Sequence, residues 1–247
     1  MSTSIPAIRA GVERVFVELP AKTISCLECR SAIRQLRNVS GFEAALERVF
    51  SPAMRFIRPL QSRMELEGLL GEVARLRPST VVEIGTASGG TLFMLARVAS
   101  TDATIVSIDL PGGAFGGGYP RWRSPLYRSF AKRGQRIHLL RRDSHDPSTL
   151  AALRDILGGR KVDFLFIDGD HTYEGVRKDY EMYRSLVQPG GMIGFHDIVP
   201  HSAESGCEVD RFWNEIRGCF DSVEFVENWR SQFGGIGLLR SYQPAAH

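Results

Sequence analysis

The sequence has 247 residues, of which 43% are hydrophobic and 24% are charged, and its formal net charge is +3. The near balance of 31 basic and 28 acidic residues argues against a nucleic-acid partner. No apolar run reaches the roughly 18 residues of a membrane span, and no signal-peptide pattern opens the chain. We therefore expect a cytoplasmic protein with reduced thiols and no membrane partner.

Residues 1–60 read as a helical appendage with irregular stretches, interrupted by Pro20, Pro52 and Pro59. Cys26 and Cys29 have the spacing of half a zinc site, but no second such pair follows. We interpret residues 24–36 as an amphipathic helix that carries two small apolar side chains. The appendage either covers the acceptor or forms an oligomer contact, and the sequence does not choose between these roles.

Residues 61–247 read as one domain in which helices and strands alternate. A helix over 62–77 is followed by a strand over 81–84, a helix over 91–99 and a strand over 104–108. The predicted elements continue with a strand at 136–140, a helix from Asp146-Pro147, a strand at 162–167, a helix at 173–187 closed by Pro189-Gly-Gly191, a strand at 192–195, a helix at 209–216, and strands at 223–226 and 235–239. The alternation predicts an α/β fold with a mainly parallel sheet covered on both faces.

A glycine-rich turn follows the first strand, in the run from Glu83 to Thr91. Small residues let the backbone turn sharply there, and the N–H groups of the following helix favour an anionic group. The spacing Gly85-x-x-x-Gly89-Gly90 matches neither the GxGxxG of dinucleotide binders nor a P-loop. The turn alone is weak evidence for any one ligand.

Acidic residues end the next two strands. Asp109 stands 24 residues after Gly85, where a carboxylate accepts the hydroxyl protons of a ribose. Asp143 and Ser144 follow the third strand, where a carboxylate and backbone N–H groups can bind an adenine edge. Together with the glycine turn they predict a site for S-adenosylmethionine, which combines adenosine with a carboxylate-bearing tail.

Over roughly residues 62–240, the chain resembles the class I S-adenosylmethionine-dependent methyltransferases. The resemblance rests on VVEIGTASGGT, on IVSIDL and on FLFIDGDHTYEGVRKDYEMYRSLVQPGGMIGFHDI. It is strongest to the bacterial group related to metal-dependent catechol-type and sugar O-methyltransferases and to cephalosporin-hydroxylase-like proteins. It implies a Rossmann-like sheet of seven strands with the last one antiparallel, and it implies cofactor contacts from Glu83, Gly85, Thr86, Ser88, Gly90, Asp109, Asp143 and Ser144, to which we add Asp168.

A second group of polar residues follows strands four and five. Asp168, Asp170 and His171 come after the fourth strand, and His196-Asp197 after the fifth. If these strands are neighbours, three carboxylates and two imidazoles converge at one edge, which would be costly without a function. We interpret His171 and Asp170 as the catalytic residues, since an imidazole can remove the proton of an acceptor hydroxyl. His171 also resembles the general base of the sugar O-methyltransferases.

The resemblance to metal-dependent relatives places ligands at Asp168, His196 and Asp197. Relatives carry Glu or Asp, then Asp or Asn, at the second and third positions, so His196 departs from their pattern. Imidazole suits zinc, iron, copper or nickel better than magnesium. Three alternatives therefore stay open: a divalent cation (magnesium, manganese or another), a cation that His196 does not bind, or a metal-free acid–base site.

The leading function is O-methylation of a small hydroxylated acceptor, such as a sugar or a natural product, by a homo-oligomer. A nicotinamide-dependent oxidoreductase and a non-catalytic cofactor-binding module are the alternatives. The glycine spacing argues against the first of them and the ionisable cluster against the second. The glycine-rich segment 111–122 carries aromatic and arginine residues, which favours a lid that closes over the substrate. His145 either contacts the cofactor or caps the helix after the third strand, and the cap is the favoured interpretation. His138 is predicted to lie packed or exposed within that strand.

Overall fold

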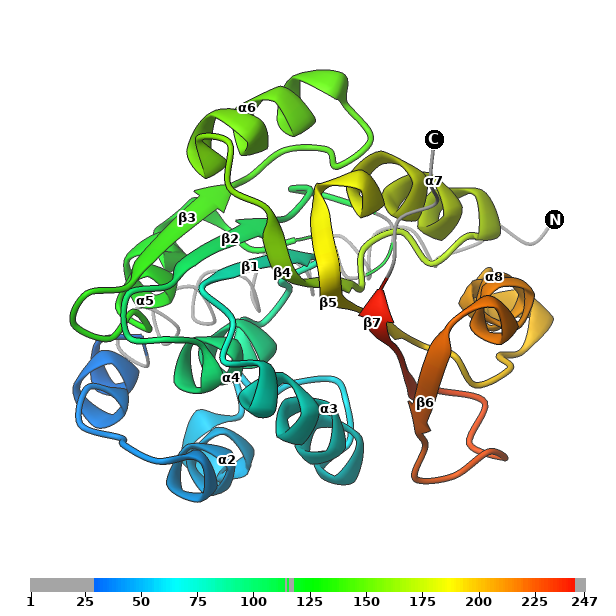
Figure 1. The fold of residues 1–247 in the computed structure, drawn as a ribbon. Helices are drawn as coiled ribbons and strands as arrows, with labels where there is room; N and C mark the ends of the chain where they lie inside the picture. Colours follow the sequence, from blue (N-terminus) through cyan, green and yellow to red (C-terminus); the bar gives the residue numbers. More distant parts are fainter. Residues whose placement is uncertain (1–28, 114, 116–117, 243–247) are drawn as a thin grey trace, which may run out of the picture.

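A computed structural model describes residues 29–113, 115 and 118–242 (Figure 1). A seven-stranded sheet with the order β3-β2-β1-β4-β5-β7-β6 forms its centre. The strands are β1 (Thr80–Ile84), β2 (Thr104–Ile108), β3 (Arg136–Leu140), β4 (Val162–Ile167), β5 (Val187–His196), β6 (Asp221–Phe225) and β7 (Ile236–Tyr242). The helices are α2 (Phe42–Phe50), α3 (Arg63–Leu76), α4 (Gly90–Val98), α5 (Ser124–Arg128), α6 (Pro147–Leu157), α7 (Tyr173–Tyr183) and α8 (Val209–Ile216), and residues 29–36 are also helical.

The strand directions follow the predicted pattern. β1 pairs in parallel with β2 and β4, β2 with β3, and β4 with β5. β7 lies between β5 and β6 and runs antiparallel to both. The Rossmann-like sheet of seven strands with an antiparallel last strand is therefore confirmed. Because β1 to β5 all run in parallel, the loops that follow them leave the same edge of the sheet.

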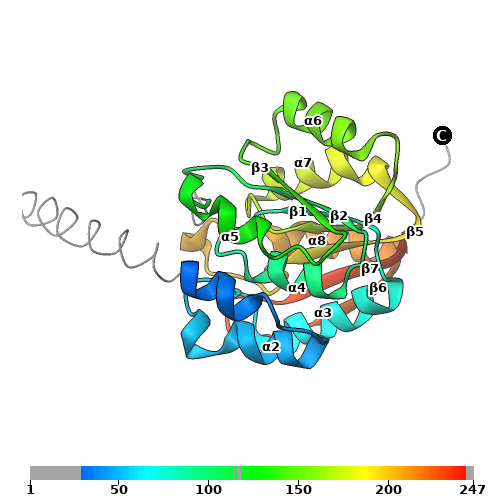
Figure 2. The same ribbon diagram turned by 90° about the vertical axis from the view of Figure 1, so that its left-hand side faces the viewer.

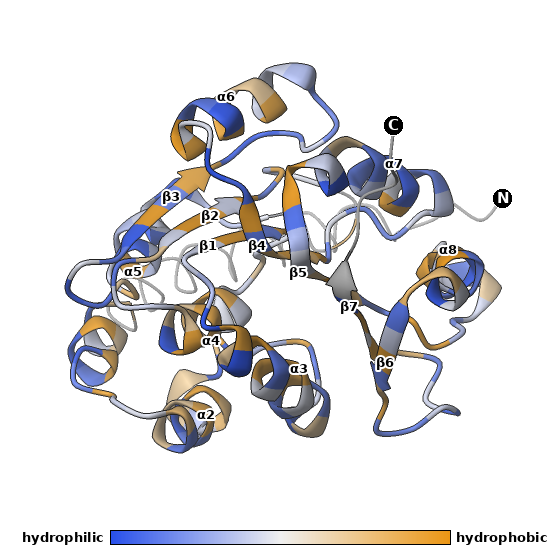
Figure 3. Ribbon diagram, viewed as in Figure 1, coloured by the Kyte–Doolittle hydropathy of each residue, from blue (hydrophilic) through white to orange (hydrophobic). Residues whose placement is uncertain are grey.

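Helices cover both faces of the sheet, and each face has its own hydrophobic core (Figures 1 and 2). On one face, α2, α3, α4 and α5 pack on side chains such as Val81 and Phe164. On the other face, α6, α7 and α8 pack on Val82 and Leu165. Adjacent strand residues thus point to opposite cores, which explains the continuous apolar runs of β1 and β4. Figure 3 shows hydrophobic residues along these central strands and mixed residues in the helices.

The described part of the N-terminal region packs into the first core. Leu46 of α2 and Met54 are fully buried in the same cluster as Phe93 of α4. A Cβ atom at Gly90 would lie 2.2 Å from the carbonyl oxygen of Ile57, so the chain before α3 presses directly on the start of α4. Cys29 is buried, while Cys26 and the predicted helical residues 24–28 lie outside the described residues.

Two local predictions meet different outcomes. Asp146 caps α6, because its side chain accepts the N–H of Ser148, and the predicted helix start is confirmed. The predicted helix over 173–187 is too long, since α7 ends at Tyr183 and a 3₁₀ turn leads into β5. Pro189-Gly-Gly191 lies inside β5 instead of closing a helix, next to a register shift where proline is tolerated.

Among the described residues, none of the helices is long and apolar enough to cross a bilayer.

Candidate active site

The glycine turn after β1 packs against the end of β4. Gly85 has a φ of 85°, and a Cβ atom there would lie 1.8 Å from the carbonyl oxygen of Asp168. Only glycine fits this position, because both the backbone angle and the space exclude a side chain. The N–H of Asp168 in turn donates to the carbonyl of Ile84 at 2.8 Å. The turn thus brings the ends of β1 and β4 into direct contact.

Asp109 at the end of β2 holds this turn. Its Oδ2 accepts the N–H of Ala87 at 2.8 Å and that of Thr86 at 3.2 Å. Its Oδ1 accepts no hydrogen bond from the described residues. Burial raises the pKa of Asp109 to about 6, although the two N–H groups oppose the rise. One oxygen therefore shapes the turn, and the other stays available to a ligand hydroxyl.

Glu83 lies fully buried beneath the turn. Its Oε2 accepts the hydroxyl of Thr86 at 2.6 Å, and that hydroxyl also lies 2.6 Å from the Ser107 hydroxyl. Its Oε1 is buried without a hydrogen-bond partner. Burial raises the pKa of Glu83 to about 8. A protonated carboxyl group thus forms the floor of the turn at neutral pH.

The loop after β3 contacts α7 through Ser144 and His145. Ser144 O accepts the hydroxyl of Tyr183, and His145 Nε2 lies 3.3 Å from Oδ1 of the buried Asp179. The neighbouring Asp179 carboxylate raises the pKa of His145. The prediction that His145 caps α6 is wrong, because Asp146 is the cap and the His145 side chain reaches α7 instead.

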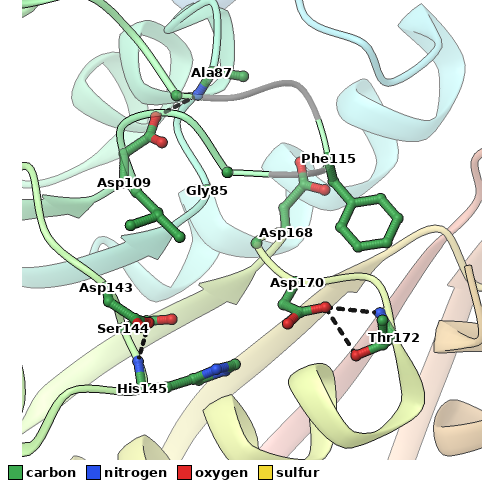
Figure 4. Close-up of a pocket in the computed structure, with 14 residues that line it drawn as sticks. Gly85, Ala87, Asp109, Phe115, Asp143, Ser144, His145, Asp168, Asp170 and Thr172 are labelled. Atoms are coloured by element: carbon green, nitrogen blue, oxygen red, sulfur yellow. Dashed lines mark hydrogen bonds between the residues drawn. The ribbon is translucent and has the colours of Figure 1, made fainter.

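A cavity of about 280 Å³ opens where these strand ends meet (Figure 4). Of the residues predicted to bind the cofactor, Gly85, Asp109, Asp143, Ser144 and Asp168 line it. The other four predicted residues do not line the cavity. The side chains of Glu83 and Thr86 lie below the turn, and Ser88 and Gly90 face the chain before α3. Phe115 and Gly118 close the cavity from the segment after β2. The cavity is slightly below the range of roughly 300–1,000 Å³ that is usual for small-molecule sites.

Four predicted residues form a cluster beside this cavity. Oδ1 of Asp168 lies 3.1 Å from Nδ1 of His196 and 3.3 Å from Nε2 of His171. Oδ2 of Asp197 lies 3.3 Å from Nδ1 of His171 and 3.4 Å from Nδ1 of His196. Each imidazole therefore contacts both carboxylates. We call Asp168, His171, His196 and Asp197 the acid–imidazole cluster.

The charges of this cluster support one another. Burial favours a protonated Asp168, yet His196 and His171 outweigh burial and lower its pKa. Asp197 responds in the same way, and its pKa is strongly lowered. Burial disfavours charged imidazoles, but the two carboxylates raise the pKa of His171 and raise that of His196 well above its ordinary value. The carboxylates are thus held ionised, and the imidazoles have a strong affinity for a proton.

Asp170 belongs to the cavity and not to the cluster. Its Oδ1 accepts the N–H and the hydroxyl of Thr172, the residue that caps α7. No ion pair joins Asp170 to His171 in the described part of the chain. The structure thus separates the two residues predicted to be catalytic: His171 faces the other acids, while Asp170 supports the start of α7.

Three further residues contact the cluster, and the sequence analysis did not single out two of them, Gln61 and Phe233. Gln61 donates to Oδ2 of Asp168 at 2.7 Å and accepts the Thr91 hydroxyl. His201 lies 3.3 Å from Oδ1 of Asp197, and the Phe233 ring stands edge-on to both His196 and His201. Gln61 carries no motif, so only the folded chain reveals it. His201 belongs to residues 198–207, which follow the fifth strand and which the sequence predicts to form a second loop at this edge.

Part of the predicted lid contacts the cluster. The Phe115 ring stacks on His171 with centroids 4.8 Å apart. A Cβ atom at Gly118 would lie 2.7 Å from Oδ1 of Asp109, so glycine permits the close approach of this segment to the carboxylate. Residues 114, 116 and 117 lie outside the described residues. The segment therefore contacts both the cavity and the cluster, and its closure on ligand binding stays a prediction.

The cluster offers a donor set that fits a divalent cation. Asp168, His196 and Asp197 each present one ligand atom within 4.8 Å of the others. A cation with ligand bonds of about 2.1 Å in an octahedron separates adjacent ligands by about 3 Å. The spacings of 3.1 and 3.4 Å from Nδ1 of His196 to the two carboxylates match this requirement.

Comparison with known proteins identifies the central part of the chain. Residues 82–198 match a family model described as a methyltransferase domain. Over 118 residues the chain is 31% identical to an uncharacterized protein of Acanthamoeba polyphaga mimivirus, covering 48% of this chain and 51% of that protein. An uncharacterized protein of Sinorhizobium fredii is 28% identical over 174 residues, which are 68% of this chain and 18% of the relative. The chain thus spans about half or less of these curated relatives.

Solved structures share the fold at low sequence identity. The O-methyltransferase TomG from Streptomyces achromogenes, involved in tomaymycin synthesis and solved with SAM, is 19% identical with a TM-score of 0.54. That match covers 80% of this chain and 90% of TomG. Cofactor-bound Rv0187 from MTB is 18% identical with a TM-score of 0.57, and the match covers 98% of this chain and 99% of that chain.

Proposed function

We propose that this chain, whose residues 82–198 match a methyltransferase-domain family, transfers the methyl group of S-adenosylmethionine to a hydroxyl oxygen of a small acceptor. The resemblance found in the sequence is confirmed by that match. The observation that carries the proposal is the position of Asp168. It lines the cavity that also contains Gly85, Asp109 and Asp143, and it belongs to the acid–imidazole cluster.

The cavity suits S-adenosylmethionine. Oδ1 of Asp109 is free to accept ribose hydroxyl protons, and we expect Asp143 and Ser144, which line the same cavity, to bind an adenine edge. Two O-methyltransferases that share this fold were solved in complex with SAM or SAH. The methyl-bearing end of the cofactor would then face Asp168 and the cluster.

The cluster suits removal of the acceptor proton. His171 contacts both Asp168 and Asp197, which stabilise its protonated form. The neutral form of an imidazole held in this way can accept the hydroxyl proton while the oxygen bonds to the methyl carbon and the bond from that carbon to sulfur breaks, and the two carboxylates then stabilise the imidazolium that forms. The stacked Phe115 ring shields His171 from water on one side. Asp170, by supporting the start of α7, fixes the backbone that carries His171.

We further propose that Asp168, Asp197 and His196 hold a divalent cation. A bound cation would lower the pKa of the acceptor hydroxyl and orient it. The alternative is a metal-free acid–base site, in which His171 and His196 balance the charges of Asp168 and Asp197 through the contacts that they make with both carboxylates.

The test is a binding and turnover experiment. S-adenosylhomocysteine should bind by calorimetry, whereas NAD should not, and S-adenosylhomocysteine should be released when acceptors from a panel of phenols, sugars and hydroxylated natural products are methylated. His171→Gln should abolish turnover and keep cofactor binding, with His138→Gln as the matched control on β3. Tight NAD binding, or turnover by His171→Gln at the wild-type rate, would contradict the proposal. Repeating the assay in chelator and with added cations separates the two mechanisms.

A further inference from the structure

A second cavity, of about 790 Å³, lies away from the candidate active site. Its lining comes from residues 33–41, from the end of α4 and from the segment 129–133 that precedes β3. The N–H of Arg136 at the start of β3 donates to Ala103 O just before β2, so this segment lies at the amino ends of the strands. The catalytic rim lies at the opposite ends, about 16 Å away along five-residue strands. Figure 2 shows the helical residues 29–36 below α5.

Four basic side chains line this cavity, namely Arg37, Arg97, Lys132 and Arg133. No aspartate or glutamate is among its described lining residues, and no described carboxylate forms an ion pair with any of the four. The other polar side chains that line it are Asn38, Ser40 and Ser129. The cavity therefore collects positive charge without an anionic partner in the part of the chain that the structure describes.

Two of these cations are partly buried. Arg97 donates to the carbonyl oxygens of Val39 and Phe130 and stacks on Phe93, and its Nε is buried without a partner. Lys132 donates to the carbonyl oxygens of Arg97 and Ala99 at 3.0 and 3.1 Å. Burial lowers the pKa of both groups, and the Arg97 charge adds to the effect at Lys132. Carbonyl oxygens hold these side chains in place but do not cancel their charge, and buried charges are normally paired.

The two remaining cations are exposed and keep their side chains free. Among the described residues, neither Arg37 nor Arg133 makes a side-chain hydrogen bond or ion pair. Guanidinium groups bind phosphate through two parallel hydrogen bonds, and they do so more specifically than an ammonium group. Three guanidinium groups and one ammonium around a cavity of this size match a ligand larger than a single inorganic ion.

We infer that this cavity binds a phosphate-bearing small molecule, at a site separate from the one that binds the methyl donor. The partly buried side chains of Arg97 and Lys132 supply a fixed positive charge, and Arg37 and Arg133 bind the ligand from the exposed side. The ligand would link residues 33–41 to the segment before β3. The Arg97 guanidinium already joins these two parts of the chain, because it donates to the carbonyl oxygens of Val39 and Phe130.

The probe is inorganic pyrophosphate, titrated by calorimetry into the full chain at moderate salt in the presence of saturating S-adenosylhomocysteine. We expect binding that the cofactor does not displace. The double variant Arg37→Gln/Arg133→Gln leaves every carbonyl bond of Arg97 and Lys132 in place and should weaken pyrophosphate binding by at least about tenfold. The matched control Arg154→Gln/Lys161→Gln removes the same charge from the region of α6 and should change binding by less than about twofold.

Three outcomes would overturn the inference. They are no pyrophosphate binding by the wild-type chain at millimolar concentration, equal weakening in both double variants, and displacement of pyrophosphate by the cofactor. Melting curves of both double variants should match the wild-type curve without ligand. If the first double variant melts early, Arg133→Gln alone replaces it, since this exposed side chain supports no other described residue.

Discussion

Two pairs of buried carboxyl groups meet at the same rim of the sheet, yet their pKa values move in opposite directions. Burial raises the pKa of Glu83 to about 8 and that of Asp109 to about 6. At Asp168 and Asp197 burial acts in the same direction, but the imidazoles reverse its effect and lower both pKa values. The difference lies in the partners, because Glu83 and Asp109 meet mainly hydroxyl and backbone N–H groups while the other two meet histidines.

This contrast divides the rim by role. The cofactor side, around Glu83 and Asp109, uses carboxyl groups to shape a backbone turn, and a neutral Glu83 serves that purpose. The acid–imidazole cluster keeps its carboxylates charged and its imidazoles basic, as proton transfer or cation binding requires. Substitutions that remove charge should therefore be severe in the cluster and milder around the turn.

Asp197→Asn should have the largest effect. Asn tolerates the left-handed backbone at this position, where φ is 64°, so the fold is expected to persist. Loss of the carboxylate removes a partner of His171, His196 and His201, and turnover should fall by about 10²–10⁴-fold. Asp197 does not line the cofactor cavity, so the affinity for S-adenosylhomocysteine should stay within about threefold of wild type.

Steady-state turnover and calorimetry check this prediction, and Asp155→Asn on the exposed side of α6 is the control. Turnover within about threefold of wild type would remove the cluster from the mechanism.

Asp109→Ala should affect binding before chemistry. The variant loses two hydrogen bonds that the N–H groups of Thr86 and Ala87 donate to the Asp109 carboxylate. It also loses the carboxylate oxygen that faces the cavity. Such bonds contribute about 1.5–3 kcal/mol, so the dissociation constant for S-adenosylhomocysteine should rise by about 10–150-fold. Asp102→Ala, an exposed acid before the same strand, should leave it unchanged. An unaltered affinity in Asp109→Ala would separate Asp109 from the cofactor.

The sequence predicts which strand ends meet at the cavity, because the signals for those strand ends are local. Gly85, Asp109 and Asp143 each follow a strand, and the alternation of strands and helices places those strand ends at one edge. The start of β5 is less predictable from the sequence. Pro189-Gly-Gly191 is typical of a turn, and only pairing with β4 and β7 makes this segment part of a strand.

The cluster is less predictable, since its contacts join distant parts of the chain. The motif placed Asp168, His171, His196 and Asp197 together, but the bond from Gln61 spans 107 residues and has no local pattern. The separate functions of Asp170 and His171, one residue apart, follow from side-chain directions that spacing does not specify. His145 was misjudged for the same reason, because its partner Asp179 lies one helix further on.

Glu83→Gln should reveal the protonated floor of the turn through stability. The pKa of Glu83 in the folded chain, about 8, lies above its ordinary value of 4.5, so the native state holds a proton that the unfolded state releases. Stability from this group is therefore full at low pH and falls as the pH rises through that window.

The amide of Glu83→Gln cannot ionise, and the variant should lose less stability than wild type between pH 5.5 and 8.5. Over this range the wild-type melting temperature should fall by about 6–13 °C relative to that of the variant, because the ionisation of Glu83 removes about 3 kcal/mol of stability. Parallel melting curves at every pH would show that Glu83 is ionised throughout.

Phe115→Ala should give the smallest effect, and it tests the contact between the two sides. The ring lines the cofactor cavity and stacks on His171, so its removal affects both. Stacking of this kind contributes about 0.5–1.5 kcal/mol, which corresponds to a turnover loss of about 2–12-fold. Phe115→Leu should keep the shielding but not the stacking, so its turnover should lie between those of wild type and Phe115→Ala. The control Met64→Ala, on the exposed side of α3, should match wild type. If the segment acts as a lid, cofactor should protect the wild-type chain from proteolysis near residue 115 and protect Phe115→Ala less. Equal protection in both would mean that the stacked ring does not hold the segment over the site.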